Sequence, residues 1–209
     1  MNIALDLDNV LIDIMGSAKR ILARELGVPV HEIIDTGIYG APFTHANPAI
    51  ADQIKTDHAF WSRHDVLAQS CPLPGAVDAA NRLHQAGQLG CYITRRPPAV
   101  AKITAASLKD HAFPDRPICH VGHTEPKRNY AMCKSTACRD HAITHMIDDH
   151  VGEARTLKEA GIAVFLIDAP TRRDERRQFL AAYPSTPVAP DVSSAVDVLL
   201  RAAATECSK

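Results

Sequence analysis

The chain has 209 residues, which suits one domain or one domain with a sizeable insertion. Hydrophobic residues make up 46% of it and charged residues 22%, and its net charge of −1 gives no sign of a nucleic-acid-binding surface. The sequence has neither an apolar run of membrane-spanning length nor a signal-peptide pattern at its start. We therefore expect a cytoplasmic protein that binds neither nucleic acid nor a membrane.

The six cysteines are spread through apolar segments, and they form no Cys-x-x-Cys pair. This spacing is typical of reduced core or surface thiols in a cytoplasmic protein. We accordingly expect neither a disulfide framework nor a zinc site.

The first predicted strand is a short apolar run, residues 2–5, and two acids, Asp6 and Asp8, follow it. Alternate residues of a strand face the same way, so both carboxylates would share a face if the strand continued. Two negative charges that lie so near each other require a cation or a proton between them. The pair is therefore a candidate magnesium site or acid/base pair. The alternative is a surface turn, because Asp8-Asn9 also suits a turn.

The next part of the chain has helical spacing over residues 13–27 and again over residues 48–61, with an irregular stretch between them. We interpret residues 14–71 as a helical cap inserted after the first strand. Phe60 and Trp61 lie in it, and we expect their rings to face the catalytic strand ends and bind substrate. The alternative is a small helical core of the cap.

From residue 72 onwards, apolar strands alternate with helices. The predicted strands span residues 89–94, 117–121, 143–147 and 162–167, and the predicted helices span residues 76–86, 99–111, 124–141, 151–160 and 193–203. Strands that are apolar throughout are typical of a parallel sheet buried on both faces. We predict an α/β fold: a Rossmann-like three-layer α/β/α core with a mainly parallel sheet, formed by residues 1–13 and 72–209.

Polar side chains follow three of these strands where each strand ends. They are Asp6 and Asp8, Thr94, and Asp148 and Asp149. In an open α/β sheet the carboxyl ends of the strands share one edge, where ligands bind. Four carboxylates there require a cation, and Mg²⁺ suits oxygen ligands and substrate phosphate. Together with a hydroxyl and a lysine, they favour phosphoryl transfer through a carboxylate nucleophile.

These residues resemble the motifs of the haloacid-dehalogenase-like (HAD) superfamily of phosphatases over nearly the whole chain. The first motif, Asp-x-Asp-x-(Thr/Val), is matched by residues 6–10, the second by Thr94, and the fourth by Asp148 and Asp149. The resemblance implies that Asp6 is the nucleophile and Asp8 the general acid/base. It implies that Asp6, the backbone carbonyl of Asp8, and Asp148 bind Mg²⁺, that Asp149 supports the metal site, and that Thr94 holds the phosphoryl oxygens.

The lysine of the third motif has two candidates, Lys127 and Lys134. Lys127 follows Pro126 at the start of a predicted helix, and we favour it slightly. Lys134 comes about two turns later, and its spacing before the acidic pair also resembles that of the family's lysine. The lysine that does not hold phosphate would be an ordinary surface residue.

Within the superfamily the chain most resembles the 5'(3')-deoxyribonucleotidase-type 5'-nucleotidases and their bacterial relatives, through residues 73–76 and 147–149. It departs from them at Arg95 and Arg96, which follow Thr94. Asn9 and Arg95 are further candidate substrate-binding residues, although a solvated position is the alternative for each arginine. The implied function is Mg²⁺-dependent hydrolysis of a nucleoside monophosphate or similar small phosphate through an aspartyl-phosphate. A phosphotransferase or mutase and a non-catalytic phosphate-binding protein are the alternatives, and the oligomeric state stays open.

Overall fold

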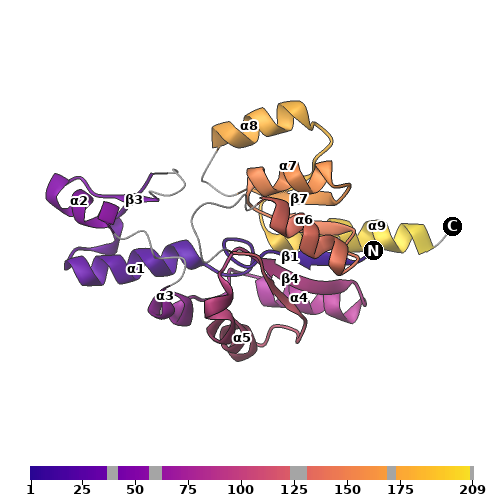
Figure 1. The fold of residues 1–209 in the computed structure, drawn as a ribbon, viewed down its shortest axis with the longest axis horizontal. Coiled ribbons are helices and arrows are strands. Elements are labelled where there is room, and N and C mark those ends of the chain that lie inside the picture. Colours follow the sequence, from indigo (N-terminus) through magenta and orange to yellow (C-terminus); the bar gives the residue numbers. More distant parts are fainter. Residues whose placement is uncertain (37–41, 57–62, 123–130, 169–172, 208–209) are drawn as a thin grey trace.

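A computed structural model of the chain describes residues 1–36, 42–56, 63–122, 131–168 and 173–207. Its centre is a six-stranded sheet in the order β5-β4-β1-β6-β7-β8, in which neighbouring strands are parallel (Figure 1). The strands are β1 (Ile3–Leu5), β4 (Leu89–Thr94), β5 (Ile118–His120), β6 (His145–Asp148), β7 (Ala163–Ile167) and β8 (Val188–Ala189). This arrangement confirms the predicted parallel sheet.

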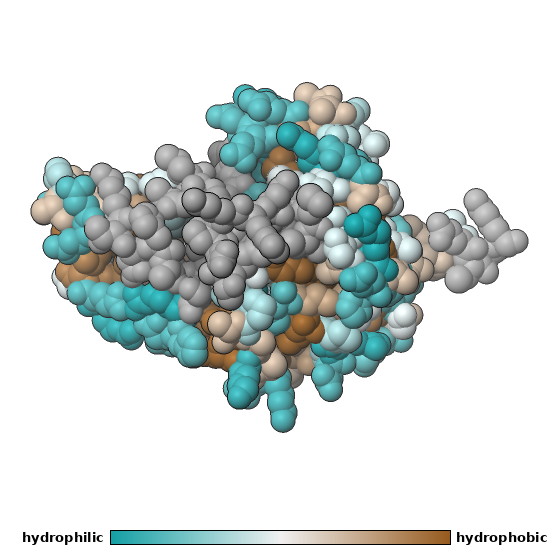
Figure 2. Space-filling view, viewed as in Figure 1, coloured by the Kyte–Doolittle hydropathy of each residue, from teal (hydrophilic) through white to brown (hydrophobic). Residues whose placement is uncertain are grey.

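Helices cover both faces of the sheet. On one face, α4 (Ala76–Gln85) and α9 (Val192–Cys207) share an apolar cluster with β1, β4 and β7, to which α5 (Ala101–Asp110) adds Leu108. On the other face, α6 (Ala131–Asp140), α7 (Val151–Glu159) and α8 (Arg173–Ala182) pack on the same sheet through a second cluster. The predicted three-layer α/β/α core is therefore confirmed. The outer side of α8, at the top of Figure 2, carries many hydrophilic side chains beside a few apolar ones.

The described part of the segment between β1 and α4 lies towards the left of Figure 1, and its helix α3 (His64–Gln69) packs against α5 of the core. This part contains α1 (Ile14–Leu26), the 3-10 helix η1 (Val30–Glu32), β2 (Ile34–Asp35), β3 (Phe43–Thr44), α2 (Pro48–Thr56) and α3. These elements bury an apolar cluster of their own, and Val100 of η3 (Pro98–Val100) packs against it from the core. The division of the chain at residues 14 and 71 stays a prediction.

Local sequence signals account for both ends of α1. Asp13 caps α1 by accepting a hydrogen bond from the Gly16 amide at 2.8 Å, and Gly27 ends the helix in the left-handed region at φ 66°. Among the described residues, five α-helices and β-strands were not predicted: β2, β3, α3, α8 and β8. Two-residue strands are too short to show alternation, and the charged sequence of α8 hides the buried position of Phe179.

Two predicted helices extend beyond the described residues. The described parts of residues 48–61 and 124–141 are α2 and α6. In the part of the chain that the structure describes, every helix is too short or too polar to cross a bilayer.

Candidate active site

The chain turns sharply after β1, and the turn separates the two acids of the first motif. The amide of Asp6 still donates to the carbonyl of Ile147 in β6 at 3.0 Å. The amides of Leu11 and Ile12 then both donate to the carbonyl of Leu7 at 2.8 Å, which closes a tight loop. The strand does not continue through Asp8, so Asp6 and Asp8 contact different partners.

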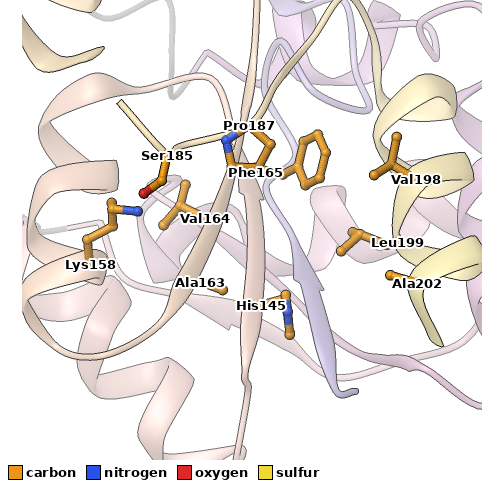
Figure 3. A pocket seen from close by; sticks show the side chains of 10 residues that line it. All are labelled: His145, Lys158, Ala163, Val164, Phe165, Ser185, Pro187, Val198, Leu199 and Ala202. Atoms are coloured by element: carbon orange, nitrogen blue, oxygen red, sulfur yellow. The ribbon is translucent and has the colours of Figure 1, made fainter. Parts of the chain in front are cut away.

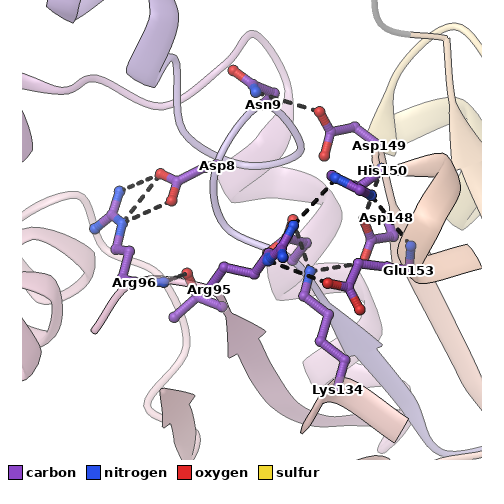
Figure 4. A network of polar contacts seen from close by, with 11 residues as sticks. Asp8, Asn9, Arg95, Arg96, Lys134, Asp148, Asp149, His150 and Glu153 are labelled. Atoms are coloured by element: carbon purple, nitrogen blue, oxygen red, sulfur yellow. Dashed lines mark hydrogen bonds and ion pairs between the residues drawn. The ribbon is translucent and has the colours of Figure 1, made fainter. Parts of the chain in front are cut away.

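Lys134 of α6 is fully buried and lies between two of the predicted acids. Its Nζ is 3.1 Å from Oδ2 of Asp6 and donates to Oδ2 of Asp148 at 2.7 Å (Figure 4). Burial lowers the pKa of Lys134, but the negative charges of Asp148 and Asp6 outweigh burial and raise it above its ordinary value. The ammonium group therefore stays charged. Lys127, the lysine that the sequence slightly favoured, lies outside the described residues, as do Phe60 and Trp61.

Three carboxylates form one compact group at this edge of the sheet. Oxygens of Asp6, Asp148 and Asp149 all lie within 4.8 Å of one another. Asp148 accepts a hydrogen bond from the amide of His150 at 2.8 Å, and Asp149 accepts one from the side chain of Asn9 at 3.3 Å. Asn9, a predicted substrate-binding residue, thus contacts an acid of the cluster.

The charges in this group are balanced only partly by Lys134. Burial raises the pKa of Asp6 well above its ordinary value, Lys134 opposes this effect, and the neighbouring Asp148 and Asp149 add to it. A divalent cation would relieve this repulsion. Carboxylate oxygens at this spacing are the hard ligands that Mg²⁺ prefers, so the residues present fit that ion.

Asp8 is held by Arg96, which the sequence analysis named beside Arg95 but did not include among the candidate site residues. Arg96 is only 2% exposed, and its Nε lies 3.1 Å from both carboxylate oxygens of Asp8, while Nη2 donates to Oδ1 at 2.7 Å. The same guanidinium donates through Nη1 to the hydroxyl of Thr104 at 3.3 Å. Figure 4 shows the carboxylate of Asp8 turned towards Arg96. The sequence contains no signal that separates a buried Arg96 from its neighbour Arg95.

Thr94 and Arg95 lie at the same edge of the sheet as the carboxylates. Thr94 ends β4, is fully buried, and accepts a hydrogen bond from the amide of Arg96 at 3.2 Å. Arg95, a predicted substrate-binding residue, has its Nη1 3.2 Å from Nε2 of His150 and its Nε 3.2 Å from the carboxylate of Glu153. Sequence reasoning missed Glu153. Burial raises the pKa of Glu153 to about 7; Lys134 and Arg95 oppose this effect, and Asp148 adds to it.

Solved structures of known proteins match this architecture over nearly the full chain. A haloacid dehalogenase-like family hydrolase from Streptococcus pneumoniae matches with a TM-score of 0.60 and 21% identity, over 96% of this chain and 97% of that one. A HAD family hydrolase from Deinococcus radiodurans R1, with bound phosphate and sodium, matches with a TM-score of 0.58 and 18% identity, over 99% and 96% of the two chains. This chain has a HAD-like fold.

A third solved structure, D,D-heptose 1,7-bisphosphate phosphatase from B. bronchiseptica complexed with magnesium and phosphate, matches with a TM-score of 0.55 and 16% identity. The match covers 96% of this chain and 99% of that one. No family model and no curated protein sequence matches the chain. The resemblance to the HAD-like fold is confirmed, and the finer resemblance to the 5'-nucleotidases stays a prediction.

A cavity of about 360 Å³ lies at the other edge of the HAD-like core (Figure 3). Its walls include His145 and Ala163, which begin β6 and β7, together with Val198 and Ala202 of α9. Since Asp148 is at the far end of β6, the cavity is separate from the acidic cluster. Its largely apolar lining makes it a poor candidate for phosphate chemistry.

Proposed function

We propose that the protein is a Mg²⁺-dependent phosphomonoester hydrolase that acts through an aspartyl-phosphate on Asp6. The observation that carries the proposal is the buried pairing of Asp6 with Lys134 inside a group of three carboxylates. The HAD-like fold supports it, as do the phosphate and magnesium that accompany two of the similar structures. The substrate we propose is a nucleoside monophosphate or a similar small phosphate.

Different residues at the edge of the sheet would bind the metal ion and the phosphoryl group. Asp6, Asp148, Asp149 and the backbone carbonyl of Asp8 would hold Mg²⁺, which when bound neutralises charge on the phosphoryl group. Lys134 and the hydroxyl of Thr94 would hold the phosphoryl oxygens by charge and hydrogen bonding.

The reaction would take two steps. In the first step, a carboxylate oxygen of Asp6 attacks phosphorus, the ester P–O bond breaks, and Asp8 gives a proton to the leaving oxygen. In the second step, Asp8 takes a proton from water, the water oxygen attacks phosphorus, and the bond to Asp6 breaks. Inorganic phosphate leaves and Asp6 is restored. Arg96, which binds both oxygens of Asp8, would orient this acid.

The test is phosphate release from para-nitrophenyl phosphate and from a panel of ribo- and deoxyribonucleoside monophosphates, with Mg²⁺ or with EDTA. We expect Mg²⁺-dependent release by the wild type, loss of release in Asp6→Asn, and full activity in Asp78→Asn. Asp78 is the matched control because it is an exposed acid on α4. Equal release by Asp6→Asn and the wild type would refute the mechanism. Phosphorylation of an added alcohol without free phosphate would instead indicate a phosphotransferase.

A further inference from the structure

A second group of potential metal ligands lies outside the acidic cluster. It consists of Cys91 in β4, Cys119 in β5 and His141 immediately after α6. One ligand atom of each residue, the two sulfurs and an imidazole nitrogen, lies within 4.8 Å of the others. Three separate elements thus bring together two thiols and an imidazole on the face of the sheet that α6 covers.

The group combines ligands in fixed positions with access from solvent. Cys91 is fully buried in the second apolar cluster, Cys119 is half-buried beside it, and His141 is exposed. The two cysteines lie on adjacent, paired strands of the sheet, so their backbone positions are fixed. The exposed imidazole leaves one side of the group open to solvent.

Electrostatics at the group favour a bound cation. A hydrogen bond between the two thiols raises the pKa of Cys91. The same hydrogen bond, together with His141, lowers the pKa of Cys119 to about 6. Asp140 places a further negative charge near Cys119. A soft or borderline metal binds thiolates and releases the thiol protons when it binds.

We propose that Cys91, Cys119 and His141 form a binding site for a thiophilic divalent ion of the Zn²⁺ type. Two thiolates and one imidazole with an open fourth position are a known ligand set for Zn²⁺. A third sulfur lies near the group: the buried thiol of Cys138, whose pKa burial raises to about 12. The site differs in chemistry from the oxygen cluster of Asp6, Asp148 and Asp149, which suits Mg²⁺.

The bound ion would connect parts of the core that carry the proposed catalytic residues. It would tie the end of α6 to β4 and β5. Lys134 lies on α6, and Thr94 ends β4. We therefore expect Zn²⁺ to stabilise the folded protein and to hold α6 in place. The sequence shows no zinc motif because the ligands are 22 to 28 residues apart and meet only in the folded sheet.

The test uses the full chain without a polyhistidine tag, stripped of metal, reduced, and titrated with Zn²⁺ or Co²⁺. We expect one equivalent of Zn²⁺ to be retained after desalting, with a sulfur-to-cobalt charge-transfer band for Co²⁺. Cys119→Ser and His141→Ala should each weaken binding by more than about tenfold. Cys71→Ser, which changes an exposed thiol outside the group, should bind as the wild type does.

Two further arms separate this site from the acidic cluster and from misfolding. Asp6→Asn should keep the charge-transfer band, because oxygen ligands do not produce it; this result holds whether or not the protein proves to be a phosphatase. His141→Ala removes an exposed side chain, so its fold should survive, and circular dichroism checks this. Absence of the band in the wild type, equal Zn²⁺ retention in His141→Ala, or a Cys91–Cys119 disulfide in place of metal binding would each overturn the proposal.

Discussion

The ion pair between Arg96 and Asp8 gives the proposed acid/base a fixed direction. Arg96→Lys keeps the positive charge but removes the planar fork that contacts both oxygens of Asp8. We expect kcat for para-nitrophenyl phosphate to fall by about 10- to 100-fold, a part of what a general acid contributes, with little change in KM. Arg82→Lys, which alters a surface ion pair of α4 and α9, is the matched control. A KM effect without a kcat effect would show that Arg96 binds substrate instead.

Lys134 forms an ion pair with each of the buried carboxylates of Asp6 and Asp148. Lys134→Met leaves these buried carboxylates without their partner, which typically costs about 3–5 kcal/mol. We expect that loss in the free energy of unfolding, measured with urea in EDTA, and a smaller loss with Mg²⁺ present. Lys102→Met, on the exposed side of α5, should change stability little. An equal loss with and without Mg²⁺ would contradict the shared charge balance.

Glu153 makes stability depend on pH. Its pKa is about 7 in the folded protein against an ordinary value of 4.5, so the unfolded chain loses this proton first as pH rises. The contribution of Glu153 is therefore fully present below about pH 4.5 and is lost as pH rises through 7, by at most about 3 kcal/mol. In EDTA, Glu153→Gln should gain stability relative to the wild type between pH 4.5 and pH 8. A difference that stays constant over this range in urea unfolding would refute the prediction.

At the scale of elements, the segment after β4 packs tightly against the segment after β5. The amide of Val121 donates to the carbonyl of Thr94 at 2.9 Å, and a Cβ added to Gly122 would lie 1.9 Å from the carbonyl oxygen of Arg95. Gly122→Ala must therefore move the loop that carries Arg96. We expect a loss of about 1–3 kcal/mol in stability and lower phosphatase activity.

Gly27→Ala is the control for this change. Gly27 ends α1 at φ 66°, and an added Cβ there would meet nothing within 4 Å. It should cost about 1 kcal/mol of backbone strain and leave activity unchanged. If Gly122→Ala matched Gly27→Ala in both stability and activity, the close packing of the two loops would have no role in the site.

At the scale of the whole molecule, the sheet order places β1 between β4 and β6 and so assembles the acidic cluster from distant parts of the chain. An ion that binds this cluster should stabilise the entire fold. At a hundred times its dissociation constant, Mg²⁺ should raise the free energy of unfolding by about 2.7 kcal/mol. This gain should disappear in Asp148→Asn and persist in Asp78→Asn. A gain of equal size in both variants would place the ion elsewhere.

Sequence periodicity and strand-end chemistry predicted much of this protein. Apolar strands that alternate with helices gave the parallel three-layer core, because burial on both faces leaves its mark in each strand. The pairing of Asp6, Asp148 and Asp149 at one edge follows from topology alone, since parallel strands end together. Short or charged elements such as β8 and α8 escaped prediction, because their packing is set by neighbours rather than by their own pattern.

Contacts between segments distant in sequence were decided only in three dimensions. Lys134 buries its ammonium between Asp6 and Asp148, and Arg96 rather than Arg95 holds Asp8, because α6 and the loop after β4 meet β1 there. The group of Cys91, Cys119 and His141 arises in the same way. The sequence by itself determined which residues end the strands, and therefore the chemistry available at the sheet edge. The partner of each charge was set by tertiary packing, because charges pair through space and not along the chain.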